Sequence, residues 1–330
     1  PYGLLRNLIA FRFQIRESDP AGRVQEKLEA GVAEALGSGE RSQQTAHLIG
    51  YLVGFEVGDS PHLAALGDDA QNLRDQALAR LGAYFGGLAA KSPVLILLED
   101  LHWADDSSLD ALDQLVEELA EQPLMVVSAA RRELFQRRPG WGEGQAFHSR
   151  LALEPLSRSQ SQSLVAEILQ QVEQVPDTLR DLIVVGAEGN PFFIEELIKM
   201  LVEDGVIVKD EGRWQVLPSR LAEIRVPPTV NGVLQARLDR LPPDERTVLQ
   251  QASVVGRLFW DLAVARVNES VADGMDVTGV QAMLSALWGR EMVFQRETSA
   301  FAAAREYVFK HALLREATYG SVLKRLRRVY

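Results

Sequence analysis

Pro93-Val-Leu-Ile-Leu-Leu-Glu99-Asp100-Leu-His102-Trp103-Ala-Asp105-Asp106 is the most informative segment of this chain. Its five apolar residues, from Val94 to Leu98, run directly into two adjacent carboxylates. A short continuous apolar run of this kind is typical of a fully buried strand. In open α/β sheets the ligand binds outside the carboxyl ends of the strands, so Glu99 and Asp100 are expected beside a ligand cleft.

A buried strand that ends in two acids has the Walker B arrangement of nucleotide-hydrolysing domains. One acid holds Mg²⁺, usually through water, and the next polarises the attacking water. Glu99 takes the first place here and Asp100 the second. The alternative, which this pattern alone does not exclude, is a buried strand that merely ends in two solvated acids.

The composition excludes several classes of protein. The chain has 330 residues, enough for about two or three domains, and 46% of them are hydrophobic. A net charge of −11 gives no general attraction to nucleic acid or to an anionic membrane. The absence of cysteine excludes disulfides, thiolate nucleophiles and Cys-type zinc sites, and it fits a cytoplasmic protein. No apolar run approaches the ~18 residues that span a bilayer.

The regions on both sides of the acidic pair predict a parallel sheet within a helical chain. Residues 1 to about 90 read as helices, with apolar stripes over 23–36 and 73–85, the second ended by Gly86-Gly87. Asp105-Asp106 opens a helix that Pro123 breaks, and 124–128 is a second buried strand. Two strands joined by one helix form a βαβ crossover, which implies parallel pairing. Residues 150–154 are a candidate third strand.

The rest of the chain is mostly helical. A capping box at Ser157–Gln160 opens a helix, and the Gly189-Asn190-Pro191 break precedes the amphipathic helix 192–203. Pro227-Pro228 marks a boundary. The helix that the capping box opens is predicted over 164–171, and further predicted helices cover 177–185, 230–241, 244–252 and 280–288. One predicted hairpin pairs 206–208 with 214–217 around 210–212, and a second pairs 292–295 with 306–309. Helices followed by a two-stranded wing suggest a winged-helix domain.

With these elements placed, the chain resembles the nucleotide-binding region of the STAND class of P-loop ATPases, which has an AAA/ORC-like ATPase region. It is most similar to the form found with adenylate/guanylate cyclase domains and tetratricopeptide repeats in signalling proteins. The resemblance covers essentially the whole chain. It is carried by Leu98–Asp105, by 124–128 leading to Arg131, and by Glu188–Leu197, Ala236–Pro242 and Phe309–Ala317.

The resemblance implies a fold that is α/β and then mostly α. Residues 1–154 would be a truncated parallel-sheet P-loop NTPase core without its P-loop unit. Residues 155–222 would be a helical lid with a small hairpin. Residues 223–330 would be a winged-helix-like domain that leads into a helical repeat region.

The resemblance also implies roles and the cofactors ATP/ADP and Mg²⁺. Glu99 and Asp100 would be the Mg²⁺-associated and water-polarising acids, in an order left open because many relatives place Asp first. Arg131 would sense the γ-phosphate, with Arg132 as the competing choice. Gly189-Asn190-Pro191 would approach the adenine ring, and His311 would lie near the phosphates.

Each role has a purely structural alternative. Arg131 could pair with surface acids, Gly189-Asn190-Pro191 could simply start a helix, and His311 could be a satisfied residue at a helix start. For His102-Trp103, packing and support of the acids is favoured over chemistry.

The Walker A loop, G-x-x-x-x-G-K-[ST], is missing from this sequence. The nearest echo, Gly86–Ser92, lacks the glycine before the lysine and precedes a strand instead of following one. The chain also begins with Pro1, and its last residues read as a helix cut mid-course. We therefore expect an excerpt of a longer protein, in which a P-loop unit precedes Pro1.

The function expected from the resemblance is an ATP-binding and hydrolysing switch in a multidomain signalling protein, an ATPase when intact and inactive as this piece. Its expected partners are its own P-loop segment and flanking effector and tetratricopeptide-repeat domains, with homo-oligomerisation left open. No membrane or DNA partner is expected. One alternative is a winged-helix DNA-binding regulator that uses Arg237, Arg240, Arg246 and Arg257. Another is a catalytically inactive scaffold.

Overall fold

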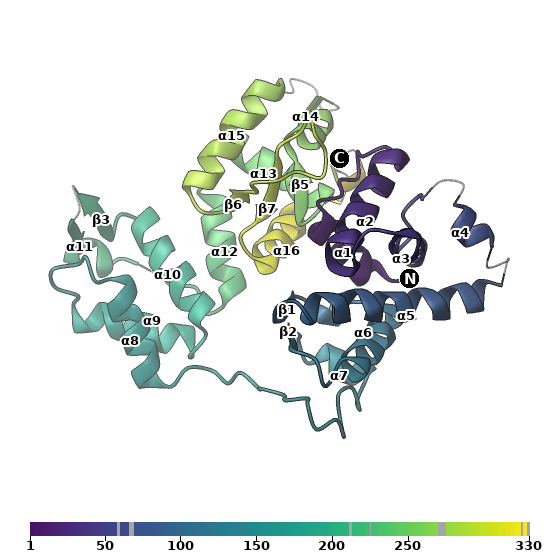
Figure 1. The fold of residues 1–330 in the computed structure, drawn as a ribbon. Helices are drawn as coiled ribbons and strands as arrows, with labels where there is room; N and C mark the ends of the chain where they lie inside the picture. Colours follow the sequence, from purple (N-terminus) through teal and green to yellow (C-terminus); the bar gives the residue numbers. More distant parts are fainter. Residues whose placement is uncertain are drawn as a thin grey trace. The chain divides into compact units, whose positions relative to one another are not determined.

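The chain folds into two compact units, which are described separately (Figure 1). The computed structural model describes residues 1–57, 60–65, 69–210, 213–224, 226–269, 275–324 and 326–328. The units are Pro1–Leu151 with Ala300–Ala302, and Ala152–Ser299 with Ala303–Tyr330. The predicted division at 154 and 222 stays a prediction. Over the described ranges, every helix is too short or too polar to cross a lipid bilayer.

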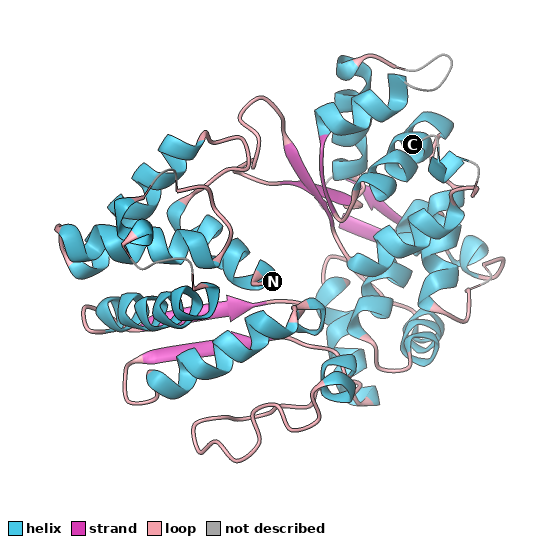
Figure 2. Ribbon diagram, turned by 90° about the vertical axis from the view of Figure 1, so that its right-hand side faces the viewer, coloured by secondary structure: helices cyan, strands magenta, loops and turns pink. Residues whose placement is uncertain are grey.

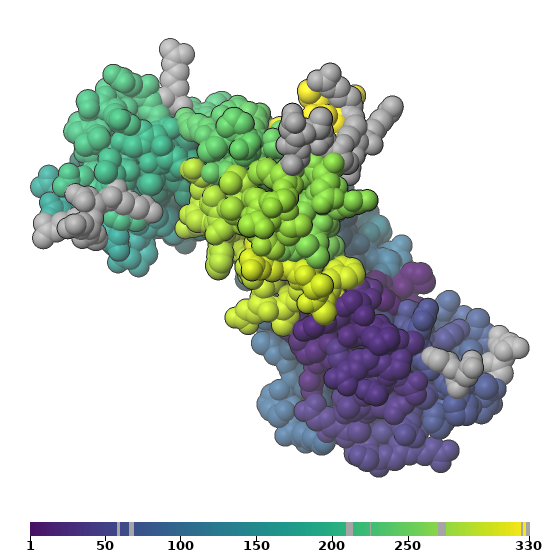
Figure 3. All heavy atoms as spheres, turned by 90° about the horizontal axis from the view of Figure 1, so that it is seen from above, coloured from purple at the N-terminus to yellow at the C-terminus, as the bar shows by residue number. Residues whose placement is uncertain are grey.

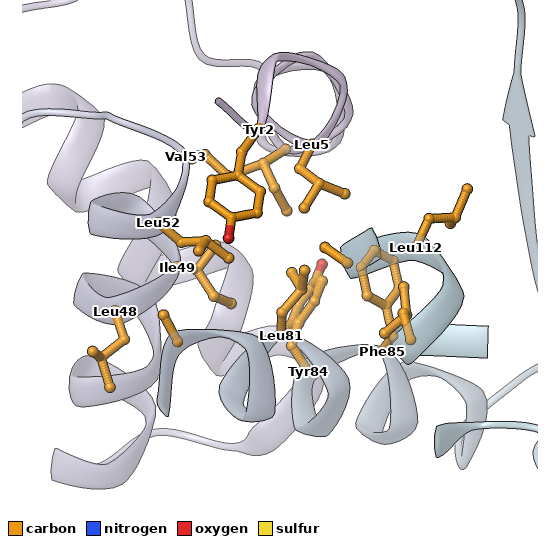
Figure 4. Close-up of a cluster of buried hydrophobic side chains, with 14 of the residues drawn as sticks. Tyr2, Leu5, Leu48, Ile49, Leu52, Val53, Leu81, Tyr84, Phe85 and Leu112 are labelled. Atoms are coloured by element: carbon orange, nitrogen blue, oxygen red, sulfur yellow. The ribbon is translucent and has the colours of Figure 1, made fainter. Parts of the chain in front are cut away.

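The first unit is built around a helical core. Its helices before the sheet are α1 (Gly3–Phe13), α2 (Ala21–Leu36), α3 (Glu40–Leu52), α4 (Pro61–Ala64) and α5 (Ala70–Ala89). Side chains from α1, α3 and α5 meet in one buried cluster, as Figure 4 shows for Leu5, Ile49 and Leu81. In the space-filling view of Figure 3, the purple residues of α1 and α2 form one continuous surface. The prediction of a mostly helical start is confirmed.

The predicted end of the helix at Gly86-Gly87 is wrong, because α5 continues to Ala89. A Cβ built on Gly87 would lie 2.5 Å from Cδ2 of Leu36. The glycine therefore lets α5 pack closely against the end of α2. Tight packing between helices, and not a break in the helix, explains this residue.

The predicted βαβ unit is present. Strands β1 (Val94–Leu98) and β2 (Leu124–Ser128) pair in parallel, with Val94 opposite Leu124 and Leu98 opposite Ser128. Helix α6 (Asp106–Glu118) forms the crossover and buries Leu109, Leu112 and Leu115. Figure 2 shows the two strands as neighbouring magenta arrows.

One face of this small sheet is bare. Ile96 and Leu98 point into the core and are 4% and 6% exposed. The alternate residues Leu95, Leu97 and Met125 are 60%, 65% and 63% exposed. Parallel sheets are normally covered on both faces, so a single covered face is unusual. Within the described ranges the sheet has only these two strands, so both of its outer edges are unpaired.

The third strand predicted at 150–154 does not form. This segment has no regular structure, and Leu151 and Leu153 are 84% and 87% exposed. A strand persists only where a neighbour satisfies its backbone groups, and no described strand lies in register with this segment. Leu151 and Leu153 do occupy alternate positions, as in a strand, but no described strand pairs with this segment.

The second unit begins with helices that carry the predicted lid motif. They are α8 (Arg158–Ile168), α9 (Asp177–Ala187) and α10 (Pro191–Glu203), followed by the hairpin β3 (Ile207–Asp210) and β4 (Arg213–Val216) and by α11 (Pro218–Leu221). The capping box at Ser157 and the hairpin are as predicted. The turn residues Glu211 and Gly212 lie outside the described residues.

The remainder of this unit is helical around a three-stranded antiparallel sheet of order β5-β7-β6. Its elements are α12 (Val230–Asp239), α13 (Pro243–Val255), β5 (Leu258–Trp260), α14 (Asp261–Glu269), α15 (Val277–Gly289), β6 (Val293–Gln295), β7 (Glu306–Phe309) and α16 (Ala312–Ser321). The 292–295 and 306–309 hairpin is confirmed. Strand β5 and helices α14 and α16 were not predicted.

A buried ion network joins α10 to α12. Arg237 is 1% exposed and pairs with the buried Glu196. Its guanidinium also contacts Glu203 at 2.6 Å and donates to the carbonyl oxygen of Arg290 at 3.2 Å. Every charge in such a network needs its partner, because an unpaired buried ion is costly.

We predict that Arg237→Met lowers the free energy of unfolding by ~3–5 kcal/mol, because it removes the buried partner of Glu196 and leaves the half-buried Lys199, at 3.2 Å, as its described counter-ion. Urea unfolding measures this change. Arg240→Met is the matched control, since Arg240 pairs with Asp204 near the surface, at 2.8 Å, and should cost under ~1 kcal/mol. Equal losses for the two variants would contradict the prediction.

Candidate functional site

The two predicted acids lie at a sharp turn after β1. Glu99 is exposed and Asp100 is half-buried. Asp100 adopts a left-handed conformation, with φ 54° and ψ 36°, and a short 3₁₀ turn, Leu101–Trp103, follows it. Non-glycine residues rarely occupy this region, and such strain is often found at functional sites. The acids therefore lie at the carboxyl end of a parallel strand, as the sequence predicts.

Backbone bonds hold this turn against the end of β2. The N–H of Ala129 donates to the carbonyl of Leu98 at 2.8 Å, and the N–H of Leu101 donates to the carbonyl of Ala129 at 3.0 Å. These bonds continue the β1–β2 ladder past the ends of both strands. The acids and the residues that follow Ala129 therefore lie together at the carboxyl ends of the two strands.

His102 links the two strand ends, and Trp103 does not. The backbone N–H of Arg131 donates to Nδ1 of His102 at 3.4 Å. His102 is 8% exposed, which agrees with the expected packing role, and its Nε2 is buried without a hydrogen-bond partner among the described residues. Trp103 is 75% exposed, so the packing role expected for it is wrong. Its ring follows a tight turn that points it into solvent.

Four arginines, Arg131, Arg132, Arg137 and Arg138, follow β2. Arg131 and Arg132 are exposed, and Arg132 directly precedes helix α7 (Glu133–Arg137). Arg137 donates to the carbonyl oxygens of Ala104, at 2.5 Å, and His102, at 3.4 Å. Arg137 thus stabilises the acid-bearing turn. The sequence reading missed it, because nothing in its neighbours indicates where its long side chain reaches.

Asp105 fixes the other end of the turn. It caps α6 by accepting from the N–H and hydroxyl of Ser108, and it accepts from the N–H groups of Tyr2 and Gly3 at 2.8 and 2.9 Å. Burial raises the pKa of Asp105, but these hydrogen bonds outweigh it and lower the pKa to about 2. One carboxylate therefore joins α1 to the helix that follows the acids.

The second unit positions the Gly189-Asn190-Pro191 motif. Gly189 has φ 78°, and a Cβ there would lie 2.4 Å from the carbonyl oxygen of Leu156. The Asn190 side chain caps α10 by accepting from the N–H of Phe193, at 3.3 Å, and Pro191 occupies the first turn. Asn190 and Pro191 are thus explained by the helix start, whereas Gly189 is needed for close backbone approach.

The structure brings His311 beside this motif. The ring of His311 lies 4.2 Å, centroid to centroid, from that of Phe192, which directly follows Pro191. Burial lowers the pKa of His311, and Glu196 opposes this shift. Nε2 of His311 is buried with no hydrogen-bond partner in the described part of the chain, so His311 is not the satisfied helix-start residue of the structural alternative. The sequence did not indicate the role of Phe192.

The predicted site residues thus form two groups. Glu99, Asp100 and Arg131 gather at one edge of the sheet in the first unit. Gly189-Asn190-Pro191 and His311 lie together in the second unit. The catalytic and binding roles of these residues stay predictions.

Glu99 and Asp100 would suit Mg²⁺ only if water and substrate phosphates supplied its remaining ligands. Among the described residues, no group of three or more His, Cys, Asp or Glu could hold a metal ion. Mg²⁺ at nucleotide sites is usually bound by one or two carboxylates together with water and substrate phosphates. Glu99 and Asp100 match that donor set in number and type.

Family models match two segments of the chain. Residues 4–127 match the model described as AAA ATPase domain, a segment that includes Glu99 and Asp100. Residues 157–214 match one described as a domain of unknown function (DUF8739). The first match supports a P-loop ATPase-like, nucleotide-binding character for this helix-rich segment with its small parallel sheet.

A relative and two solved structures are similar over most of the chain. An uncharacterized protein of Rhizobium meliloti (strain 1021) is 24% identical over 274 residues, covering 79% of this chain, and the chain spans 24% of that protein's length. The Aeropyrum pernix ORC1 protein in complex with DNA is 15% identical, with a TM-score of 0.30, and the match covers 96% of this chain and 90% of that one.

A Walker-type ATPase of Pyrococcus abyssi is 10% identical, with a TM-score of 0.27 and coverage of 94% and 82%. Neither structure is similar enough to carry an argument about fold or function.

We predict that Asp105→Ala destabilises the chain by about 2 kcal/mol at pH 7, because α6 loses its N-cap. The pKa of Asp105 is lower in the folded chain than its unfolded value of 3.8. Asp105 therefore stabilises the folded chain at pH values above 3.8, and this contribution is lost as the pH falls towards 2. Unfolding at pH 2 to 5 should therefore show a shallower pH dependence in the variant. Glu117→Ala, at an exposed acid of the same helix, should keep the wild-type profile. A variant as pH-dependent as the wild type would refute this assignment.

Proposed function

We propose that this chain is the nucleotide-operated part of a regulatory ATPase of the STAND class, as found in cyclase-associated signalling proteins. One observation carries the proposal: an exposed acidic turn, Glu99-Asp100, at the carboxyl end of a parallel strand inside the segment that matches an AAA ATPase domain. ATP or ADP would set the arrangement of the ATPase core and the domains that follow it, and this arrangement would be passed to attached effector domains.

The chain's own residues would act as follows. Glu99 and Asp100 would hold Mg²⁺, in part through water, and orient the nucleophilic water by accepting its hydrogen bond. Bound Mg²⁺ would supply charge neutralisation at the phosphate oxygens. Arg131 extends from the same sheet edge and would bind the terminal phosphate through its guanidinium. His102 and Arg137 would keep the turn in place through the bonds described above.

In the second unit, Gly189-Asn190-Pro191 would lie against the adenine ring and His311 would face the phosphates. The buried, unpartnered Nε2 of His311 supports this role, because burial keeps the imidazole neutral and one ring nitrogen lacks a partner among the described residues. The β5-β7-β6 sheet and its helices would form the winged-helix-like domain.

A P-loop segment outside these 330 residues would complete the core. The bare sheet face with Leu95, Leu97 and Met125 and the unpaired sheet edges support such a partner. So does the irregular segment with the exposed Leu151 and Leu153, which would form a strand only beside a neighbouring strand. The lysine and backbone N–H groups of that loop would supply the main grip on phosphate.

The DNA-binding alternative loses support from the ion pairs. Of its candidate residues, Arg237 is buried, Arg240 pairs with Asp204 at 2.8 Å, and Arg246 pairs with Asp239 at 3.0 Å. A DNA-binding surface needs basic side chains that can reach phosphate. We therefore do not propose a DNA partner.

In the longer protein that carries a P-loop, Glu99→Gln and Asp100→Asn should lower ATP turnover by about 10²–10⁴-fold, the usual contribution of a positioned acid or base. ATP affinity should change little, because the P-loop provides most of the phosphate contacts. Phosphate release and nucleotide titration measure the two quantities. Glu117→Gln, an exposed acid on α6, is the control. Unchanged turnover in both variants would remove the assignment.

For the 330-residue chain alone, we predict ATP binding weaker than micromolar and negligible hydrolysis, because it lacks the Walker A loop. Isothermal titration with Mg-ATP tests this expectation. Adding the P-loop segment in cis should restore tight binding. Micromolar affinity of the chain alone would show that phosphate is held by other groups.

A further inference from the structure

A hollow of about 330 Å³ lies in the first unit, between α6 and the segment that follows α7. Its wall is formed by Asp113 of α6, by Arg137 and Arg138 at the end of α7, and by Pro139, Gly140 and Trp141. Pockets for whole ligands usually measure ~300–1,000 Å³, so this hollow suits a small molecule or a single side chain.

A tight turn provides the aromatic part of the wall. In Arg138-Pro139-Gly140-Trp141, the backbone N–H of Trp141 donates to the carbonyl of Arg138 at 3.1 Å, which closes a β-turn with proline at its second position. The ring of His148 packs edge-on against the ring of Trp141, with centroids 6.1 Å apart. Gly142, with φ 77°, permits this packing, because a Cβ there would lie 2.5 Å from Nε2 of His148. The half-buried indole is therefore fixed at the wall of the hollow.

The ion pairs around the hollow leave one carboxylate for a ligand. Arg137 pairs with Asp106 at 3.6 Å, and Arg138 pairs with Asp110. Asp113 is half-buried, and among the described residues it belongs to no ion pair. Burial raises the pKa of Asp113, and the guanidinium of Arg138 opposes this shift. Because a carboxylate withdrawn from water is costly without a partner, this wall favours a cation.

The chemistry of the wall selects the type of cation. An anion is disfavoured, because both guanidiniums of the wall already pair with aspartates. An uncharged apolar group would leave Asp113 without a partner. The face of a tryptophan ring attracts cations, and Trp141 lines the same hollow as the carboxylate. Since the wall offers one such carboxylate, a compact ammonium matches it better than the broad fork of a guanidinium does.

We propose that this hollow binds an alkylammonium group, which donates hydrogen bonds to the carboxylate of Asp113 and lies against the ring of Trp141. The alkyl chain would pack on Pro139 and the indole. A free diamine and a lysine side chain of another protein both carry this group. The wall includes neither Glu99 nor Asp100, so the site is additional to the proposed nucleotide site.

n-Butylamine is the first probe. Each of the five tryptophans gives one indole N–H signal in NMR, and Trp141→Phe identifies the signal of Trp141. Titration of the 330-residue chain with n-butylamine at pH 7 should shift this signal and leave that of Trp288 unchanged. n-Butanol has the same shape without the charge and should bind at least about tenfold more weakly, the usual effect of losing a charge-assisted hydrogen bond. Butyrate should not bind, and butyrate binding as tight as that of the amine would overturn the proposal.

Two variants should change the affinity for n-butylamine in opposite directions. Asp113→Asn keeps the shape of the side chain and should weaken binding at least about tenfold. Arg138→Gln removes a like charge and should strengthen binding about threefold, a gain that loss of folding cannot produce. Glu117→Gln, at an exposed acid of the same helix, is the control and should bind as the wild type does. Unchanged affinity of Asp113→Asn, or weaker binding by Arg138→Gln that melts as the wild type does, would overturn the proposal.

Larger probes separate the two sources of the ammonium group. Putrescine represents a free diamine, and Nα-acetyl-lysine methylamide represents a lysine within a protein. The tighter binder of the two identifies the source, and Asp113→Asn should weaken both. Failure of both to bind would overturn the proposal. None of these titrations contains nucleotide, so their outcome is independent of the roles proposed for Glu99 and Asp100.

Discussion

Parallel pairing of β1 with β2 is the constraint on which the first unit depends. Because the strands run in the same direction, the acids after β1 and the arginines after β2 lie at the same end of the sheet, where both strands end. The ladder bonds of Leu98 and Leu101 with Ala129 hold the turn closed, and they offset the strained backbone of Asp100. Asp105 then connects this edge to the start of α1. The acidic corner is thus rigid on both sides.

The second unit relies on a different kind of constraint, a buried charge network. Arg237 holds α10 through Glu196 and Glu203, and it reaches the backbone at Arg290. Since Phe192 lies at the start of α10 and contacts His311 near the start of α16, this network also fixes how those rings meet. Removing water from the charges makes each partner indispensable, which favours a single arrangement of the helices.

The fold was predictable where a periodic pattern and a local signal agree. The apolar runs of β1 and β2, the acids that cap α6 and the capping box at Ser157 all specify their own structure, and they were predicted correctly. Errors arose where a distant partner decides. Helix α5 continues through Gly87, which packs against Leu36, and 150–154 forms no strand because no described strand pairs with it. Strand β5 is three residues long, too short for a pattern to show.

The same distinction applies to the candidate site. Glu99 and Asp100 follow a strand directly, so their position at a sheet edge could be derived from the sequence alone. Arg137 acts through contacts that the fold creates, and nothing in its neighbouring sequence shows that its side chain reaches the acid-bearing turn.

The uncovered side of β1 and β2 also has a consequence for the behaviour of the 330-residue chain in solution. Leu95, Leu97, Met125 and Val127 form an apolar stripe, and in the described part of the chain no further strand pairs with β1 or β2 beside it. Such an edge is a template for adding strands from other chains. At raised concentration the chain would thus tend to self-associate through this surface.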